Sequence, residues 1–393
     1  MNVYVLGAGV SKTVGYPLGV GLFDEIDSYV RGSSPCFNRF DYAKDWGALK
    51  RWLGMHKNPV VAEAYRSRQF EHLFTIFDLA WRLRLDSLGS VLRSAKSGKR
   101  AVASAERAWR ALKTTTDSYQ KYRQILLWAL ENFLGYMHEK DAKNFLGRDW
   151  NTLRALGRKL CPGDVVLTFN YDSTLERVLW EQEKWSPADG YGFDLVFQKS
   201  GRDSSVVSLP KSKVKIIHLH GSVGWYNKPA LREDYPFASG GGAIPREALT
   251  PAPIETPIAL DPLFLRDLGI PAVDASLPKR PSSERQVFLH PSFLKDYELE
   301  GENRLFIRLW RLGAECLRSA DEIAIVGYSL PDADSAALTL LLTSCGEAHM
   351  DVVNRNRETS FRLQRLFSAN SKSHWVASPA ISIEDWLPTV ADC

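Results

Sequence analysis

Short, uninterrupted hydrophobic runs recur along the chain and predict buried β-strands. They stand at residues 3–6 (VYVL), 164–170 (DVVLTFN), 214–221 (VKIIHLHG), 322–329 (EIAIVGYS) and 350–356 (MDVVNRN). A strand that is buried on both faces carries a continuous apolar run, which is typical of parallel sheets covered by helices. Because helical or loop-like stretches separate the runs, we predict an α/β fold with a doubly wound, mostly parallel sheet.

Between the first two runs, hydrophobic positions recur at the spacing of an α-helix. The segments FEHLFTIFDLAWRL (70–83) and YQKYRQILLWALENFLGYM (119–137) place apolar side chains three and four residues apart. This pattern predicts a helical insert subdomain at residues 23–150, which divides the sheet domain into residues 1–22 and 151–393. Residues 227–292 hold many prolines and glycines and are predicted to form long surface loops over one edge of the sheet.

The composition is that of an ordinary globular protein. Of 393 residues, 45% are hydrophobic and 24% are charged, and a net charge of +4 is too small to indicate a nucleic-acid or membrane-surface protein. No apolar stretch reaches the length of about 18 residues that a membrane span needs, and the N-terminus has no secretion signal. We therefore expect a cytoplasmic protein without membrane contact.

The cysteines predict neither a metal site nor a disulfide framework. They are odd in number and widely scattered, with no CxxC pair: Cys36, Cys161, Cys316, Cys345 and Cys393. This spacing favours reduced thiols, as expected in the cytoplasm.

Candidate chemistry begins with the glycines that follow the first predicted strand. Gly7-Ala8-Gly9 offers a bare backbone whose amides can approach a pyrophosphate, so the loop indicates a dinucleotide ligand. The dehydrogenase fingerprint GxGxxG is broken, because Lys12 stands where the third glycine is expected. A tight structural turn is the alternative explanation for these glycines.

Four further motifs follow at the ends of predicted strands. GAGVSKTVGYP, TFNYD, HLHGS, GYSLPDAD and VVN occur in this order along the chain. The ordered set resembles the SIR2 (sirtuin) superfamily, and specifically the SIR2-like domains of bacterial antiphage defence proteins. The resemblance covers residues 1–22 and 160–375, and it implies a Rossmann-like fold that binds NAD.

The resemblance also implies roles for individual residues. Asn170 matches the asparagine that sits by the nicotinamide ribose and orients a nucleophile, while His220 matches the general base. Asp172 matches the acid beside the nicotinamide carboxamide, although it could also cap the following helix. His218 lies deeper on the same strand face and is expected to be a hydrogen-bonded structural histidine.

The remaining matched residues are implied to hold phosphates and the adenosine ribose. Gly7, Ala8, Gly9 and Ser11 match the loop that cradles phosphates, with the serine hydroxyl as an additional donor. Gly327, Ser329 and Asn354 match positions around the adenosine ribose and phosphates. Turn formation is the alternative role for these last three residues.

Two departures from the sirtuin pattern favour hydrolysis over deacylation. The four-cysteine zinc module of the deacetylases is missing, and the arginine of the family's IPxFR stretch is absent, because Pro17 is followed by Leu18, Gly19 and Val20. The prediction is an NAD glycohydrolase that takes NAD+ as substrate, needs no metal, and uses Asn170 and His220 at the glycosidic bond. An NAD-dependent protein deacylase or ADP-ribosyltransferase, and a non-catalytic subunit that binds NAD or ADP-ribose, are the alternatives.

The resemblance further implies an NAD-depleting effector of antiphage defence, of the abortive-infection kind. Such an enzyme must be restrained, so we expect a partner such as a HerA-like ATPase or another sensor protein, without direct nucleic-acid binding. We also expect a homo-oligomer built through the helical insert. Its helices carry many aromatic residues, which could instead pack the insert onto the sheet domain: Trp81, Trp109, Tyr119, Tyr122, Trp128 and Phe133.

Overall fold

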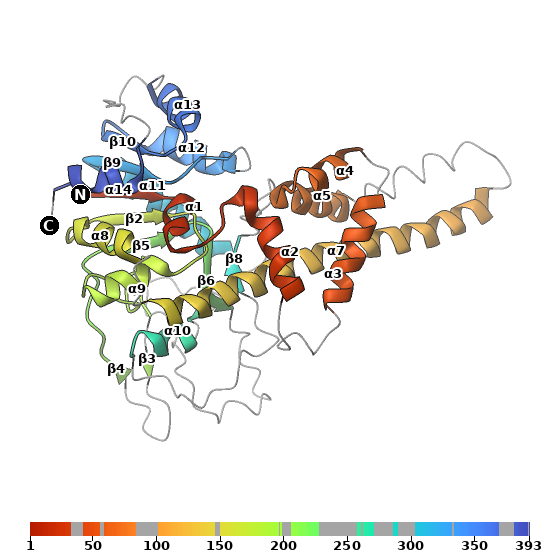
Figure 1. The fold of residues 1–393 in the computed structure, drawn as a ribbon, viewed down its shortest axis with the longest axis horizontal. Helices are drawn as coiled ribbons and strands as arrows, with labels where there is room; N and C mark the ends of the chain where they lie inside the picture. Colours follow the sequence, from red (N-terminus) through yellow and green to blue (C-terminus); the bar gives the residue numbers. More distant parts are fainter. Residues whose placement is uncertain are drawn as a thin grey trace. The chain divides into compact units, whose positions relative to one another are not determined.

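A computed structural model of the chain describes residues 1–32, 42–55, 59–83, 101–145, 150–195, 197–198, 206–227, 258–260, 262–270, 286–289, 303–331, 334–368, 381–391 and 393. The chain forms two units (Figure 1). The sheet unit comprises Met1–Tyr16, Leu134–Leu289 and Asp296–Cys393, and the helical unit comprises Pro17–Phe133 and His290–Lys295.

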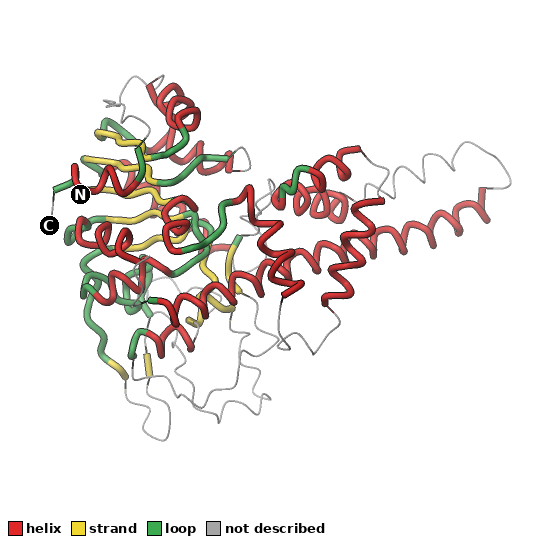
Figure 2. The backbone as a smooth tube through the Cα atoms, viewed as in Figure 1, coloured by secondary structure: helices red, strands yellow, loops and turns green. Residues whose placement is uncertain are grey.

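The five predicted hydrophobic runs form one parallel sheet in the sheet unit, which confirms the α/β prediction (Figure 2). The strands are β1 (Asn2–Leu6), β2 (Val165–Thr168), β5 (Lys215–His218), β9 (Glu322–Val326) and β10 (His349–Val353). Their order is β10-β9-β1-β2-β5, and all four neighbouring pairs are parallel. From β1 the chain first adds β2 and β5 on one side of that strand. It then crosses to the other side of β1 and adds β9 and β10, so the order of strand addition reverses between β1 and β9.

Helices pack around this sheet, which explains why the central residues of its strands are apolar. Val3, Val5, Val166 and Ile325 have no exposed surface. In the sheet unit, α8 packs on α9 and α11 packs on α12. The helices are α1 (Ala8–Ser11), α8 (Asn151–Lys159), α9 (Thr174–Glu181), α10 (Pro262–Asp267), α11 (Asn303–Arg318), α12 (Ser335–Ser344), α13 (Arg357–Ser368) and α14 (Ile383–Trp386), with 3-10 turns η1 (Lys12–Val14) and η7 (Leu387–Thr389).

Two small antiparallel sheets accompany the main one. Strands β6 (Gly221–Asn227), β7 (Ile258–Leu260) and β8 (Gln286–Phe288) have the order β7-β6-β8, and β3 (Phe197–Gln198) pairs with β4 (Val206–Val207). The prediction of long loops over residues 227–292 is therefore wrong at β7, α10 and β8. Within that stretch, residues 228–257, 261, 271–285 and 290–292 lie outside the described residues.

The helical unit consists of helices, including the two segments whose hydrophobic spacing predicted them, and its bounds differ from the predicted 23–150. It contains η2 (Gly19–Gly21), α2 (Leu22–Gly32), α3 (Tyr42–Met55), α4 (Pro59–Arg66), α5 (Phe70–Leu83) and the first part of α7 (Ala101–Asn144), whose last residues belong to the sheet unit.

Aromatic side chains pack within the helical unit. The ring of Trp52 lies 5.4 Å from that of Tyr119 and 4.9 Å from that of Tyr122, and the rings of Tyr29 and Phe133 are 5.7 Å apart. Tyr119 and Phe133 are buried. Three of the six aromatic residues on which the oligomer prediction rested therefore pack inside the unit, while the side chains of Trp81 and Trp109 lie outside the described residues.

The prediction that the cysteines are all reduced thiols is wrong for two of them. Cys161 and Cys393 form a disulfide with their Cα atoms 5.3 Å apart, although 232 residues separate them in sequence. Their pairing follows from the C-terminal segment, which folds back onto α8: the Lys159 Nζ donates a hydrogen bond of 2.5 Å to the main-chain oxygen of Val390. Cys316 and Cys345 are free thiols.

None of the described helices has both the length and the apolar character that crossing a membrane requires.

Candidate functional site

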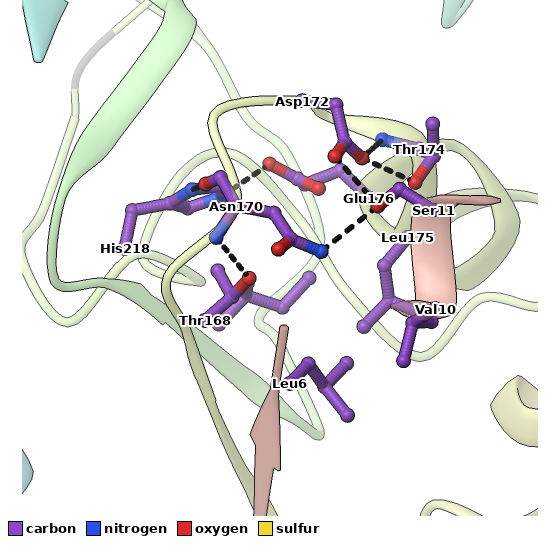
Figure 3. Close-up of a pocket in the computed structure, with 11 residues that line it drawn as sticks. Leu6, Val10, Ser11, Thr168, Asn170, Asp172, Thr174, Leu175, Glu176 and His218 are labelled. Carbon is purple, nitrogen blue, oxygen red and sulfur yellow. Dashed lines mark hydrogen bonds and ion pairs between the residues drawn. The ribbon is translucent and has the colours of Figure 1, made fainter. Parts of the chain in front are cut away.

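Three of the predicted site residues meet at the carboxyl edge of the main sheet. The Asn170 Nδ2 donates a hydrogen bond of 2.8 Å to the Ser11 Oγ, which in turn donates one of 2.6 Å to the Asp172 Oδ2 (Figure 3). Ser11 follows β1, while Asn170 and Asp172 follow β2, which is the neighbouring strand in the sheet. The chain of hydrogen bonds arises because parallel strands end at the same edge.

The orientation of the Asn170 amide follows from these bonds. The Ser11 hydroxyl proton is directed to a carboxylate, so its oxygen accepts from Asn170 and the atom that faces it must be nitrogen. The same Nδ2 also donates to the main-chain oxygen of Gly7 at 3.0 Å. The Oδ1 of Asn170 is thereby left as the amide atom that can accept a hydrogen bond from a ligand.

Asp172 also holds the start of α9. Its Oδ1 accepts hydrogen bonds from the main-chain nitrogen of Thr174, at 3.2 Å, and from the hydroxyl of the same residue, at 2.5 Å. Ser173, at the N-cap position, makes no capping bond with its own side chain. The helix-capping role that the sequence left open for Asp172 is therefore present, together with its bond to Ser11.

A small cavity lies among these residues, with room for about one water molecule. Polar side chains and the apolar ends of the strands line it together. Its lining residues are Leu6, Val10, Ser11, Thr168, Asn170, Asp172, Thr174, Leu175, Glu176, Ile216 and His218. A ligand the size of a nicotinamide ring requires these side chains to move apart.

The backbone amides of Gly7 and Gly9 are bonded to the last residue of β9 and to the residue that follows it. The main-chain nitrogen of Gly7 donates to the oxygen of Val326 at 3.1 Å, and that of Gly9 donates to the oxygen of Gly327 at 2.9 Å. A Cβ on Gly7 would lie 2.5 Å from the Cα of Tyr328, and one on Gly9 would lie 2.7 Å from the Gly327 oxygen. Packing of two neighbouring loops is therefore sufficient to explain both glycines, and phosphate binding by Gly7, Ala8 and Gly9 stays a prediction.

The structure does not bring His220 into the cavity with Asn170. His220 is 3% exposed, and its ring lies 5.0 Å from Phe169 and 6.4 Å from Trp310. Its Nε2 is 3.6 Å from the Asp334 Oδ1, and the other oxygen of this carboxylate accepts a hydrogen bond of 2.7 Å from the Tyr328 hydroxyl. His220 thus adjoins the Asn170 segment through Phe169, with a carboxylate on its Nε2 side.

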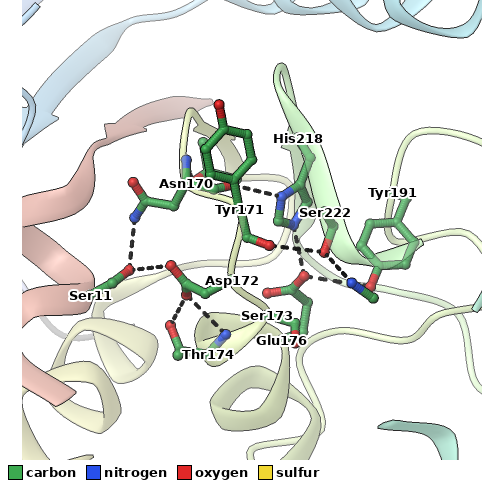
Figure 4. Close-up of polar contacts among 12 residues, drawn as sticks. Ser11, Asn170, Tyr171, Asp172, Ser173, Thr174, Glu176, Tyr191, His218 and Ser222 are labelled. Carbon is green, nitrogen blue, oxygen red and sulfur yellow. Dashed lines mark hydrogen bonds and ion pairs between the residues drawn. The ribbon is translucent and has the colours of Figure 1, made fainter. Parts of the chain in front are cut away.

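His218 lines the cavity instead, together with a glutamate that the sequence analysis missed. As expected, His218 is buried and hydrogen-bonded: its Nε2 lies 2.7 Å from the Glu176 Oε1 and its Nδ1 lies 3.2 Å from the main-chain oxygen of Asn170 (Figure 4). The sequence did carry a signal for Glu176. It stands three residues before Leu179 in the predicted helix STLERVLW, at a spacing that places both on one face.

The residues matched to the adenosine ribose lie at the ends of β9 and β10 and take part in turns. Gly327 has a φ of +62°, which favours glycine. The Asn354 Nδ2 donates to the main-chain oxygen of Tyr328 at 3.3 Å, and the main-chain oxygen of Ser329 accepts from Arg362 at 2.7 Å. These contacts account for a turn-forming role and leave ribose binding as a prediction.

A second buried polar cluster involves the end of α7 within the sheet unit. The Tyr16 hydroxyl donates a hydrogen bond of 2.6 Å to the Asp141 Oδ2. Burial raises the pKa of Asp141 to about 7, against the lowering effect of the Tyr16 hydrogen bond. Asp141 is therefore a carboxyl group that titrates near neutral pH.

No protein-family model matches the chain, and no curated protein matches it by sequence. In the part of the chain that the structure describes, no group of three His, Cys, Asp or Glu side chains is placed to hold a metal ion.

Proposed function

We propose that the protein is an NAD glycohydrolase, which converts NAD+ and water to nicotinamide, ADP-ribose and a proton. The observation that carries this proposal is the chain of hydrogen bonds from Asn170 through Ser11 to Asp172. The SIR2-like motifs assign Asn170 and Asp172 to the nicotinamide end of NAD, and Ser11 to the loop that cradles its phosphates. Two segments about 160 residues apart in sequence contribute them to one cavity.

The sheet supports a Rossmann-like, doubly wound fold as part of the proposal. The spatial order β10-β9-β1-β2-β5 places side by side the fifth, fourth, first, second and third strands that the chain contributes to this sheet. Dinucleotide-binding sheets of the Rossmann type have this order, and their ligands bind at the carboxyl ends of the strands near the point of reversal. The loops that follow β1, β2 and β9 all begin at that edge.

The proposed reaction uses the orientation of Asn170. The bond between C1′ of the ribose and the nicotinamide nitrogen breaks, and its electron pair leaves with neutral nicotinamide. A water molecule held by the Asn170 Oδ1 attacks C1′, and its proton passes to His220 as general base and then to solvent. Because His220 does not line the closed cavity, this step follows the movement of side chains that admits NAD+. An amide suits this position because it accepts a hydrogen bond without changing charge across the working pH range.

The size of the cavity bears on regulation. A site with room for about one water fits an effector that is inactive until its side chains move apart. The restrained effector of antiphage defence and its HerA-like or other sensor partner belong to the same proposal and follow from the motif resemblance. The homo-oligomer belongs to it as well, and its support is the aromatic content of the helical insert.

The proposal is tested by measuring nicotinamide release from NAD+ by the purified protein, by itself and with candidate partner proteins. Wild-type protein should release nicotinamide, and Asn170→Ala should lose this activity by about 100-fold or more. Asn151→Ala, at an exposed position on α8, is the matched control and should behave as wild type. Binding of NAD+ without turnover under every condition would support the non-catalytic alternative. Strong stimulation by an acetyl-lysine peptide would support the deacylase alternative.

A further inference from the structure

The imidazole of His218 is held between two hydrogen-bond acceptors. Its Nδ1 faces the main-chain oxygen of Asn170 at 3.2 Å, and its Nε2 faces the Glu176 Oε1 at 2.7 Å (Figure 4). A carbonyl oxygen and an ionised carboxylate can only accept. Both contacts are therefore satisfied together only when Nδ1 carries one proton and a second proton lies between Nε2 and Oε1.

The surroundings retain this second proton. Burial is the largest single influence and opposes the charge of the imidazolium. Glu176, the Asn170 carbonyl and Asp172 together outweigh it, so the pKa of His218 is raised above its ordinary 6.5. Two further ionisable side chains lie around the pair. Tyr191 places its hydroxyl 3.5 Å from the Glu176 Oε1, and Asp172 lies on the cavity side.

Loss of the second proton would disturb Asn170. A neutral imidazole has one N–H, so it must turn a lone pair either toward the Asn170 oxygen or toward the Glu176 carboxylate. Either contact then becomes repulsive in a buried site, where the low dielectric increases the cost. Because the Asn170 main chain and its amide are parts of one residue, a shift of its carbonyl moves the Oδ1 that the proposed reaction uses.

We propose that Glu176 and His218 are positioning residues that hold Asn170 in place only while they share a proton. This inference rests on the proposed NAD cleavage and extends it to two residues that do not touch the reacting atoms. Its independent support is geometric: both residues line the same cavity as Ser11, Asn170 and Asp172. A fully buried ion pair is weak evidence for a purely stabilising role, since desolvation offsets much of its attraction.

Substitution Glu176→Gln removes the negative charge of residue 176 but keeps a hydrogen bond to the His218 Nε2. The glutamine amide can donate to Nε2 of a neutral imidazole, while Nδ1–H continues to donate to Asn170. Both contacts then survive without the second proton. In wild-type protein, nicotinamide release should decline as pH rises through the raised pKa of His218, by about tenfold per pH unit above it. Glu176→Gln should show no such alkaline decline.

The same pH series contains two controls. Any decline at acid pH, which the proposal assigns to His220, should be the same in both proteins. Glu181→Gln changes another glutamate of α9, whose Oε2 lies 2.9 Å from Arg154 and whose side chain is 40% exposed, and it should keep the wild-type profile. Identical alkaline profiles in wild-type protein and Glu176→Gln would overturn the inference.

A readout that does not depend on turnover distinguishes failure of this inference from failure of the proposed function. Nitrogen-15 shifts of the imidazoles report whether each ring carries one proton or two, and His218→Asn identifies the His218 signals among the eight histidines. The inference predicts a doubly protonated His218 at neutral pH in wild-type protein and a singly protonated ring in Glu176→Gln. A singly protonated His218 beside an ionised Glu176 in wild-type protein would refute the shared proton, whereas absence of NAD cleavage with the expected shifts would refute only the proposed function.

Discussion

At the scale of single residues, Asn170 connects the loop after β1 with His218 of β5. Its amide bonds to Ser11 and Gly7, and its main-chain oxygen faces His218. The sequence could predict that residues after β1 and β2 meet, because hydrophobic runs show where parallel strands end. It did not identify Glu176, whose contact depends on how α9 is rotated over the sheet.

His220 provides a prediction at this scale. Replacing it with glutamine retains volume and hydrogen bonding but removes the proposed proton acceptor, so nicotinamide release should fall by about 100-fold or more. The free energy of unfolding should change less than in His220→Ala, which leaves a cavity beside Phe169 and Trp310. Turnover and urea unfolding of both variants provide the measurements. Near-wild-type turnover in His220→Gln would show that another group accepts the proton.

At the scale of elements, the hydrophobic runs predicted the main sheet well because its strands are buried on both faces. The antiparallel β7 and β8 were missed, since strands of three residues are too short to show an alternating pattern among prolines and glycines. The glycines after β1 show a different limit. Phosphate binding and close packing both require a residue without a Cβ. The sequence therefore could not distinguish a phosphate-binding loop from a loop that packs against the residues after β9.

Substitution Gly9→Ala tests which role dominates. The added Cβ would lie 2.7 Å from the Gly327 oxygen and 2.8 Å from its Cα, so the two loops must separate. We expect the free energy of unfolding, measured with urea, to fall by about 1–3 kcal/mol. Gly19→Ala is the control, because no atom lies within 4 Å of the added Cβ. Unchanged stability with lost NAD binding would favour a role confined to the ligand.

The part of α7 in the sheet unit provides a pH-dependent prediction. Asp141 has a pKa of about 7 in the folded protein, against an ordinary 3.8. The folded state therefore holds a proton that the unfolded state releases between these values, and stability declines as pH rises from about 4 to 7. Asp141→Asn should remove this decline and raise the free energy of unfolding at pH 8 by on the order of 2–4 kcal/mol.

Urea unfolding at pH 4 and pH 8 measures the effect of Asp141→Asn. The gain should be small at the lower pH, where Asp141 is already neutral in the fold. Glu139→Gln, at an exposed position on the same helix, should change stability little at either pH. An equal gain at both values would mean that proton binding by Asp141 is not the cause.

At the scale of the whole molecule, long-range connections escaped the sequence analysis. The Cys161–Cys393 pair links the loop after α8 to the last residue of the sequence, and neither an odd number of cysteines nor their spacing indicated it. The predicted oligomer stays a prediction. Its aromatic argument is weaker than the sequence suggested, because Tyr119, Tyr122 and Phe133 pack against neighbours within the helical unit.

The disulfide closes a long loop, so its reduction should increase the entropy of the unfolded chain and lower the free energy of unfolding by about 2–4 kcal/mol. Thermal unfolding with and without a reductant should show a lower Tm in the reduced protein. Cys393→Ser should resemble reduced wild-type protein and respond no further to the reductant. Cys316→Ser leaves the disulfide intact and should retain the response, whereas a Tm insensitive to reductant in wild-type protein would contradict the pairing.

The most direct test of the proposed hydrolysis is product analysis of NAD+ incubated with the protein in water enriched in oxygen-18. The proposed mechanism predicts equal amounts of nicotinamide and ADP-ribose, with oxygen from the water at C1′ of the ADP-ribose and no product in Asn170→Ala. Release of nicotinamide with the ADP-ribose attached to a protein or peptide would contradict hydrolysis, as would intact NAD+ under every condition and with every partner tested.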